Sequence, residues 1–304
     1  MATFILSYPD KAFVPHGISD QAASAPSGAA FAQWLRLCDE IHRHQGRILV
    51  IDPEAVGPVS PVYAALLGSP FLSPGKLPQP VFLRANHGEP QAEDAVQRAI
   101  SDAGLQVRAA QHRWQGQVDL IPVGRNRFIL TYGSGDHGSS LHAIEEIKEL
   151  LPLGAQVMAI ELSEGCPRGS AALTCITDPS NKSVVLVSRR ALKSHTPESI
   201  GPFVGNNVEV SILSNEDASV FASECINVRG TLILPVGCST ILRGFLIRRG
   251  FQLAEVDVSL LVGPQGGGPR LLACELPGLV LSDEAPSYLL RRERLHILAS
   301  EYPT

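Results

Sequence analysis

A weak internal repeat constrains the fold of this chain more than any other feature. The unit is an apolar strand, an amphipathic helix, a glycine and a second apolar strand, and it occurs five times. The copies comprise residues 3–8, 30–44, Gly46 and 47–52; 81–84, 92–103, Gly104 and 105–108; 127–132, 140–151, Gly154 and 156–161; 183–188, 197–204, Gly205 and 208–213; and 231–235, 239–249, Gly250 and 251–257. A repeat of this length indicates that one supersecondary unit is used several times.

The helix of each unit is expected to be amphipathic, and the glycine after it suits a left-handed C-cap. In the third helix, apolar residues recur on one face and charged residues occupy the other. We expect the first set to be buried and the second to face solvent, namely Leu141, Ile144, Ile147 and Leu151 against Glu145, Glu146 and Lys148.

Two architectures accommodate five such units. One is an open, doubly wound parallel sheet, and the other is a closed ring of five blades. The segments between the units contain further short apolar strands, such as residues 117–122 and 171–176. A doubly wound sheet does not need these strands, whereas a propeller of small mixed sheets does. The pattern therefore favours an α/β propeller.

Charge and composition exclude several classes of protein. The chain has 304 residues, a formal net charge of −5 and no long basic run, which argues against binding nucleic acid or an anionic membrane. We expect neither a signal peptide nor a membrane span, because the first residues contain no basic segment followed by an apolar one and no stretch approaches about 20 apolar residues. The six cysteines are scattered and have no zinc-ligand spacing, so we expect free thiols in the cytoplasm and neither a metal nor a cofactor.

Three segments resemble a known superfamily in the same order along the chain. Residues 114–133 resemble the Phe-Glu-Gly-x-Gly-Asp segment, strand and turn of the penteins, which include amidinotransferases, arginine deiminases and dimethylarginine dimethylaminohydrolases. Residues 230–238 resemble the penultimate strand of these proteins, and residues 255–259 and 266–276 resemble their C-terminal catalytic segment. The resemblance implies one five-fold pseudosymmetric propeller of ββαβ repeats over residues 1–280, followed by a helical tail over residues 281–304.

The same resemblance implies a catalytic cysteine, a proton-shuttling histidine and guanidinium-binding carboxylates. The cysteine position maps to Leu271, the histidine position falls nearest Gly169, and the glutamate position maps to Gln115. No histidine occurs between residues 142 and 195, so no change of register restores the proton shuttle. We therefore expect that the standard reaction does not run.

Cys274 is the fallback nucleophile. It lies three residues beyond Leu271, and alternation along a strand puts it on the opposite face, so we expect it in the core unless a bulge intervenes. Cys238, in the turn after the fifth central strand, is a weaker candidate.

A pocket at the centre of the propeller is expected to hold the remaining polar groups. Asp119 is the one carboxylate that matches the family, and accepting backbone N–H bonds is as reasonable a role for it as binding a ligand. The expected pocket residues are Trp114, Gln115, Asp119, Asp136, His137, Gly268 and Leu271.

A dinucleotide fingerprint, Gly-x-Gly-x-x-Gly, spans residues 133–138 between a strand and a helix. The family resemblance already places a glycine turn there, so we favour a tight turn with Ser139 or Ser140 as N-cap. Asp136 with His137 and His87 with Glu89 could bind a metal, but each pair lacks a third ligand.

Three functions remain open at this stage. The favoured one is a degenerate guanidino-modifying protein that binds a small molecule in its central channel or a protein partner. The second is a hydrolase or transferase with altered chemistry on a less basic substrate, in amino-acid or specialised metabolism. The third is a dinucleotide-dependent oxidoreductase. The sequence leaves both homodimerisation and the identity of the ligand open.

Overall fold

Five small sheets of three strands each build the molecule. The computed structural model describes residues 2–9, 27–51, 63–72, 80–88, 94, 97–98, 100–102, 104–124, 126–133, 138–193, 197–205, 208–262, 266–277 and 287–301. In each sheet the middle strand pairs antiparallel with one neighbour and parallel with the other. The predicted five-bladed α/β propeller is confirmed.

The five sheets, written as antiparallel, middle and parallel strand, are β15 (Cys274–Glu275), β1 (Thr3–Ser7) and β2 (Arg47–Ile51); β3 (Gly68–Leu72), β4 (Pro80–Arg84) and β5 (Gln106–Ala109); β6 (Leu120–Pro122), β7 (Arg127–Tyr132) and β8 (Gln156–Glu161); β9 (Leu173–Thr177), β10 (Ser183–Val187) and β11 (Val208–Ile212); and β12 (Ile226–Val228), β13 (Thr231–Pro235) and β14 (Gln252–Val256). The first sheet joins the two ends of the chain, because β15 pairs with β1. This pairing closes the ring.

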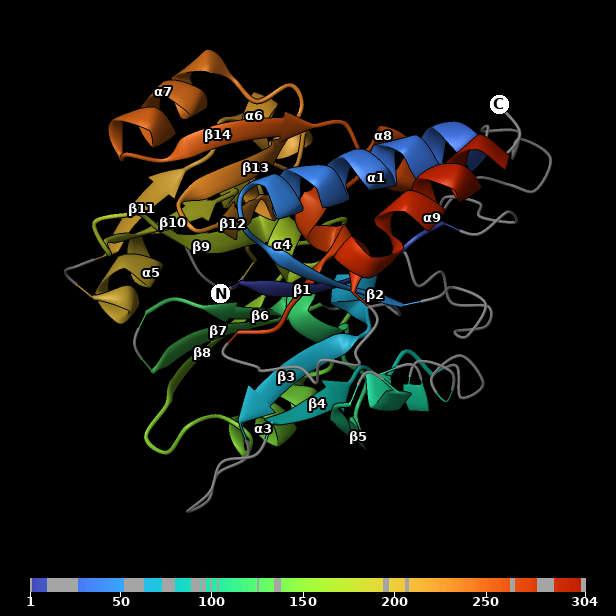
Figure 1. The fold of residues 1–304 in the computed structure, drawn as a ribbon. Helices are drawn as coiled ribbons and strands as arrows, with labels where there is room; N and C mark the ends of the chain where they lie inside the picture. The colour runs from blue at the N-terminus through green and yellow to red at the C-terminus, as the bar shows by residue number, and fades with distance from the viewer. Residues whose placement is uncertain are drawn as a thin grey trace.

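Helices on the outside of the ring connect the middle strand of a blade to its parallel strand (Figure 1). They are α1 (Ser27–Arg43), α3 (Leu141–Lys148), α5 (Pro197–Val204) and α7 (Thr240–Arg248), and helical residues at 94, 97–98 and 100–102 occupy this place in the second blade. The shorter helices α6 (Asn215–Ser219) and α8 (Ser259–Val262) lie in other connections.

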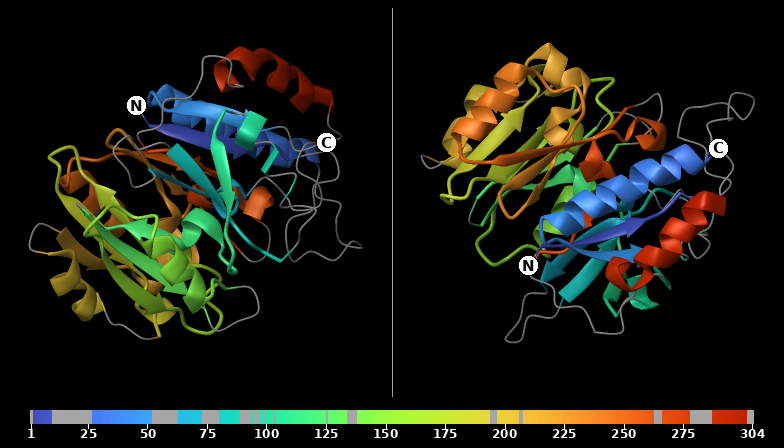
Figure 2. Two further views of the ribbon diagram at one scale, coloured as in Figure 1. Left: turned by 90° about the horizontal axis from the view of Figure 1, so that it is seen from below. Right: turned by 45° about the horizontal axis from the view of Figure 1, so that its top comes forward.

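The C-terminal helix α9 (Tyr288–Glu301) packs beside α1 next to β1 and β2, as both views in Figure 2 show. Tyr288 is buried in the same apolar cluster as Trp34 of α1, and its hydroxyl donates to Asp39 Oδ1 at 3.0 Å. The side chain of Arg292 contacts the same carboxylate. The helix is therefore bound to the first blade by both apolar and polar contacts.

Two details of the predicted helices are wrong. In α3, Leu141 is 53% exposed and Glu146 is buried, because the Glu146 carboxylate accepts hydrogen bonds from the backbone N–H groups of Gln111 and His112. After α1, the left-handed residue is Gln45 (φ 66°) rather than Gly46. Gly46 is required for another reason, since a Cβ there would lie 2.5 Å from Cγ2 of Ile41.

A short helical turn precedes the antiparallel strand of every blade. These turns are η2 (Ala64–Leu66), η3 (Gly116–Asp119), α4 (Gly169–Ala172), η5 (Ala222–Glu224) and η6 (Pro269–Leu272). Residues 117–122 and 171–176, predicted as strands, are therefore each part helical turn and part strand. Successive turns contact one another around the axis, η2 with η3 and η6, and α4 with η3 and η5. They form a ring at the carboxyl ends of the middle strands.

Candidate functional site

Asp119 is the first polar centre in the ring of turns. Its carboxylate is 1% exposed and accepts three hydrogen bonds, from Thr131 Oγ1 (2.7 Å), Ser139 Oγ (2.5 Å) and the backbone N–H of Gly169 (2.7 Å). Burial raises the pKa of Asp119, and these hydrogen bonds together with Arg168 oppose the rise. The donors around Asp119 hold three segments of the chain together.

The two residues before η3 are Trp114 and Gln115, and Gln115 is linked to Asp119 through Ser139. The backbone N–H of Gln115 donates to Ser139 Oγ at 3.0 Å, and Ser139 Oγ in turn donates to Asp119. Trp114 is buried in an apolar cluster between the second and third blades, with its ring centroid 6.2 Å from that of Phe71. The structure thus places Gln115 beside Asp119 and Trp114 in the core.

The second polar centre is an ion pair between Arg168 and Glu224, which the sequence analysis did not single out. Arg168 Nε donates to Glu224 Oε1 at 2.5 Å, and Arg168 Nη2 donates to Oε2 at 2.9 Å. The two side chains are 7% and 0% exposed. Burial lowers the pKa of Arg168, but the adjacent Glu224 carboxylate outweighs this and raises it above the ordinary value. Arg168 is therefore charged.

Glu224 has two further donors. Ser170 Oγ and the backbone N–H of Gly268 each donate to its carboxylate at 2.6 Å. The guanidinium has two further contacts as well. Arg168 Nη2 donates to the carbonyl oxygen of Gly266 at 3.1 Å, and Arg168 Cζ lies 5.5 Å from the ring centroid of Phe221.

The triple glycine wraps around this ion pair. A Cβ on Gly266, which has a φ of 70°, would lie 2.2 Å from Cε2 of Phe221. A Cβ on Gly267 would lie 2.8 Å from Arg168 Nη2, and one on Gly268 would lie 2.7 Å from Cβ of Glu224. No larger residue fits at these positions without a shift of Phe221, Arg168 or Glu224.

Leu271 and Cys274 lie in different apolar clusters. Leu271, in η6, is buried with residues of α1 and α8, close to the triple glycine. Cys274 is fully buried with Ile5 and Leu49 of the first sheet, and its Sγ lies 3.6 Å from the carbonyl oxygen of Gly68. The two side chains therefore have different neighbours, and Cys274 is enclosed by the core.

The remaining predicted residues are placed as follows. Asp136 and His137 lie outside the described residues, as do the central residues of the glycine fingerprint. Ser140 is the N-cap of α3, and its Oγ accepts from the N–H of Ala143 at 3.2 Å. Cys238 is buried, with Sγ 3.4 Å from the carbonyl oxygen of Pro235.

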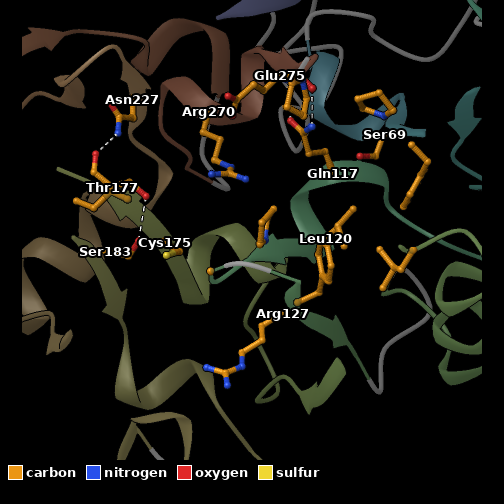
Figure 3. Close-up of a pocket in the computed structure, with 18 of the residues that line it drawn as sticks. Ser69, Gln117, Leu120, Arg127, Cys175, Thr177, Ser183, Asn227, Arg270 and Glu275 are labelled. Carbon is orange, nitrogen blue, oxygen red and sulfur yellow. Dashed lines mark hydrogen bonds between the residues drawn. The ribbon is translucent and has the colours of Figure 1, made fainter. Parts of the chain in front are cut away.

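The antiparallel strands of all five blades line a central cavity of about 1080 Å³. None of the three glycines lines it, and Figure 3 shows Arg270 pointing into it between residues of β9 and η3. Its described charged lining residues are Arg127, Arg270 and Glu275. This cavity is thus separate from the polar centres at Asp119 and Glu224, neither of which lines it.

Two ionisable side chains of this cavity, Arg270 and Glu275, interact electrostatically. Arg270 Nη1 donates to Thr174 Oγ1 at 3.1 Å. Burial raises the pKa of Glu275, whereas the positive charge of Arg270 opposes the rise. Gln117 holds the backbone of Glu275 through both of its side-chain atoms, at 2.8 Å each. Burial thus disfavours the negative charge of Glu275, and Arg127 and Arg270 are the described basic side chains at the cavity.

Among the described residues, no group of three or more His, Cys, Asp or Glu side chains is placed to bind a metal ion. Within the same part of the chain, no helix is long and apolar enough to cross a bilayer.

The fold of this chain is similar to that of several solved structures. No family model and no curated protein matches the sequence. Among solved structures, the N-terminal domain of ArgZ, an arginine dihydrolase of the ornithine–ammonia cycle in cyanobacteria, has a TM-score of 0.72 at 17% identity, over 90% of this chain and 98% of that one. AgrE in complex with L-arginine has a TM-score of 0.74 at 18% identity, over 94% of this chain and 42% of that one. DDAH from Pseudomonas aeruginosa in complex with citrulline has a TM-score of 0.63 at 16% identity, over 90% of this chain and 98% of that one. The chain has the fold of the pentein superfamily.

Proposed function

We propose that this chain is a pentein-fold protein that has lost the thiol chemistry of guanidino-modifying enzymes and binds a small carboxylate-bearing molecule in its central cavity. The loss of thiol chemistry is inferred from the raised pKa values of the cysteines. The binding of a carboxylate is inferred from the position of Arg270 in the cavity.

Burial raises the pKa of all six thiols. It raises the pKa of Cys166, Cys175 and Cys225 to about 11 and that of Cys238 to about 12, and it shifts Cys38 and Cys274 in the same direction. A nucleophilic cysteine reacts as the thiolate. A thiol of pKa 11 is ionised to roughly one part in three thousand at pH 7.5, too little for an efficient nucleophile.

The positions that the resemblance assigns to catalysis offer no substitute. Leu271 is apolar, Gly169 has no side chain, and Gln115 carries no charge. Asp119 already accepts three hydrogen bonds from the protein. A guanidinium brought to this region would find neither an attacking group nor a proton acceptor.

The central cavity has the features of a small-molecule site. Its volume of about 1080 Å³ lies just above the usual range for ligand pockets, about 300–1,000 Å³. Strands from all five blades form its wall, so its shape is fixed by the whole ring. Arg270 presents a guanidinium, the side chain best suited to a carboxylate.

Turnover and thiol reactivity test the loss of chemistry. We expect no product from arginine, dimethylarginine or agmatine, and an iodoacetamide reaction rate that rises steadily between pH 7 and 10. A cysteine whose reaction rate reaches a plateau near neutral pH, or measurable release of ureido or amidino product, would contradict the proposal.

Thermal shift tests the binding site. We expect ornithine, citrulline or succinate to raise the melting temperature of the wild type and to have no effect on Arg270→Ala. Arg127→Ala is the matched control, because Arg127 lies at the same cavity but donates to Gln156 and to the carbonyl oxygen of Val204. Stabilisation that persists in Arg270→Ala would exclude this cavity. Dimerisation or capture of a protein partner without any ligand response would favour a partner-binding role.

The alternative of an enzyme with altered chemistry has weaker support. Its candidate groups within the described residues are Asp119, Cys238 and Cys274. Asp119 already accepts three hydrogen bonds from the protein, and burial raises the pKa of both thiols. The dinucleotide alternative requires a doubly wound sheet, whereas the sheet that contains β7 has three strands.

A further inference from the structure

The Arg168–Glu224 pair contains all the parts of a receptor for a planar guanidinium ion. Two parallel N–H bonds join the guanidinium to the carboxylate, a carbonyl oxygen of Gly266 accepts a third, and the ring of Phe221 lies against the planar group. Paired donors of this kind match a carboxylate in both geometry and charge. A lysine ammonium could not reproduce them.

The receptor half of the pair is held in place without the arginine. Ser170 Oγ and the backbone N–H of Gly268 fix the Glu224 carboxylate, and Ser223 Oγ donates to the carbonyl oxygen of Ala171 beside it. Glu224 itself lies in η5, within the ring of five turns. Truncation of Arg168 therefore leaves an oriented, buried carboxylate facing a guanidinium-shaped space.

This receptor lies where the family resemblance places its chemistry. Arg168 directly precedes Gly169, the position nearest the expected histidine. A Cβ on Gly267 would contact both Arg168 Nη2, at 2.8 Å, and Cδ2 of Leu271, at 3.0 Å. The guanidinium of Arg168 is thus adjacent to the position that maps to the catalytic cysteine.

We propose that Arg168 is an internal guanidinium ligand: the chain fills its own guanidinium receptor, which excludes external guanidino compounds and becomes a binding site for them when Arg168 is truncated. The inference concerns the same end of the propeller as the proposed loss of chemistry, but it does not depend on a ligand in the central cavity.

Chemical rescue of Arg168→Ala tests this inference in the full chain. Ethylguanidinium contains the atoms that the substitution removes beyond Cβ. We expect Arg168→Ala to melt at a lower temperature than the wild type, and about 10 mM ethylguanidinium chloride to restore at least half of the loss through binding to the folded state. An equal concentration of ethylammonium chloride is expected to have no effect, and titration calorimetry should show one site per chain.

Two variants control the experiment. Arg168→Ala with Glu224→Gln should not respond, because the anionic receptor is gone. Arg127→Ala removes an arginine that donates to Gln156 and to a carbonyl oxygen rather than to a carboxylate, and it should not respond either. If Arg168→Ala does not accumulate as folded protein, its refolding yield in ethylguanidinium against ethylammonium gives the same comparison.

Several results would overturn the inference. Ethylguanidinium could stabilise the wild type as much as Arg168→Ala, or it could still stabilise Arg168→Ala after Glu224→Gln is added. Either result would show that ethylguanidinium binds at another site. Arg168→Met could prove as stable as the wild type while Arg168→Ala binds no ethylguanidinium. The Arg168–Glu224 contact would then be an ordinary buried ion pair that apolar residues can replace. Turnover of arginine by the wild type would contradict both the proposed function and the exclusion of external guanidino compounds, whereas failure of the rescue alone would leave the proposed function standing.

Discussion

At the scale of single residues, Asp119 and Glu224 have the same structural role. Each is the last residue of a helical turn, and each accepts a backbone N–H at the start of the turn in the next blade, from Gly169 and Gly268 respectively. A negative charge at the start of a helical turn stabilises the unpaired N–H groups there. The two carboxylates differ in their other partners, which are two hydroxyls for Asp119 and a guanidinium for Glu224.

Asp119→Ala should destabilise the protein strongly. The substitution leaves three buried donors without their acceptor, and each unsatisfied donor costs about 1–3 kcal/mol, so we expect a loss of at least about 3 kcal/mol in the free energy of unfolding. Urea denaturation measures the loss. Asp102→Ala is the control, since Asp102 is an exposed helical residue and should change stability by less than about 0.5 kcal/mol. Similar values for the two variants would contradict the assigned role.

Glu275→Gln should alter the pH dependence of stability. Burial raises the pKa of Glu275 in the folded protein, so the folded state binds the proton more tightly than the unfolded state does. The wild type therefore loses stability as the pH rises from about 4.3, the ordinary pKa of Glu, through the folded pKa. The variant lacks this loss, and its melting temperature relative to the wild type should increase between pH 4 and 7. A constant difference across this range would show that Glu275 is not perturbed.

The sequence predicted one residue of the polar centres but not the ion pair. Asp119 was found because it matches a family position, but Arg168 and Glu224 are separated by 56 residues and no local pattern connects them. The one available indication was an arginine in a stretch of small and apolar residues, residues 166–176, where a charge needs a partner when it is buried.

At the scale of elements, long apolar runs were predictable and short turns were not. The strands β7, β8 and β13 and the helix α5 have the bounds that their patterns predict. The five turns of the ring have only three or four residues each, too few to show a helical period. Glu146 departs from the helical pattern for a different reason. Its hydrogen-bond donors, the N–H groups of Gln111 and His112, lie in another segment, and these tertiary contacts bury it.

The helix α9 should contribute to the stability of the first blade. Tyr288 is fully buried against Trp34, with their ring centroids 6.3 Å apart, so Tyr288→Ala should cost about 3–5 kcal/mol. Leu290→Ala in the same helix is the control, because Leu290 is 79% exposed and should be nearly neutral. Thermal unfolding of both variants tests the difference. An equally small effect of the two substitutions would show that α9 is only loosely attached.

At the scale of the whole molecule, the propeller depends on how its ring is closed. The closing sheet joins strands from the two ends of the chain, and β15 pairs with β1 at only two residue positions. In contrast, β9 pairs with β10 and β3 pairs with β4 at five positions each. Fewer ladder contacts lower the free energy of local opening. The pairing of β15 with β1, which we call the β15 seam, is therefore the expected starting point for opening of the ring.

Native-state hydrogen exchange tests this expectation. The N–H of Leu276 donates to the carbonyl oxygen of Thr3 at 2.8 Å and reports on the seam, whereas the N–H groups of Val185 and Leu186 lie in the centre of β10. We expect Leu276 to exchange faster than both. The seam is also connected to η3 through Gln117, whose side chain binds the backbone of Glu275. Gln117→Ala should therefore accelerate exchange at Leu276 and leave β10 unchanged. Uniform exchange across the two strands would instead mean that the ring opens only by global unfolding, with the short closing ladder protected by the packing of α1 and α9 against it.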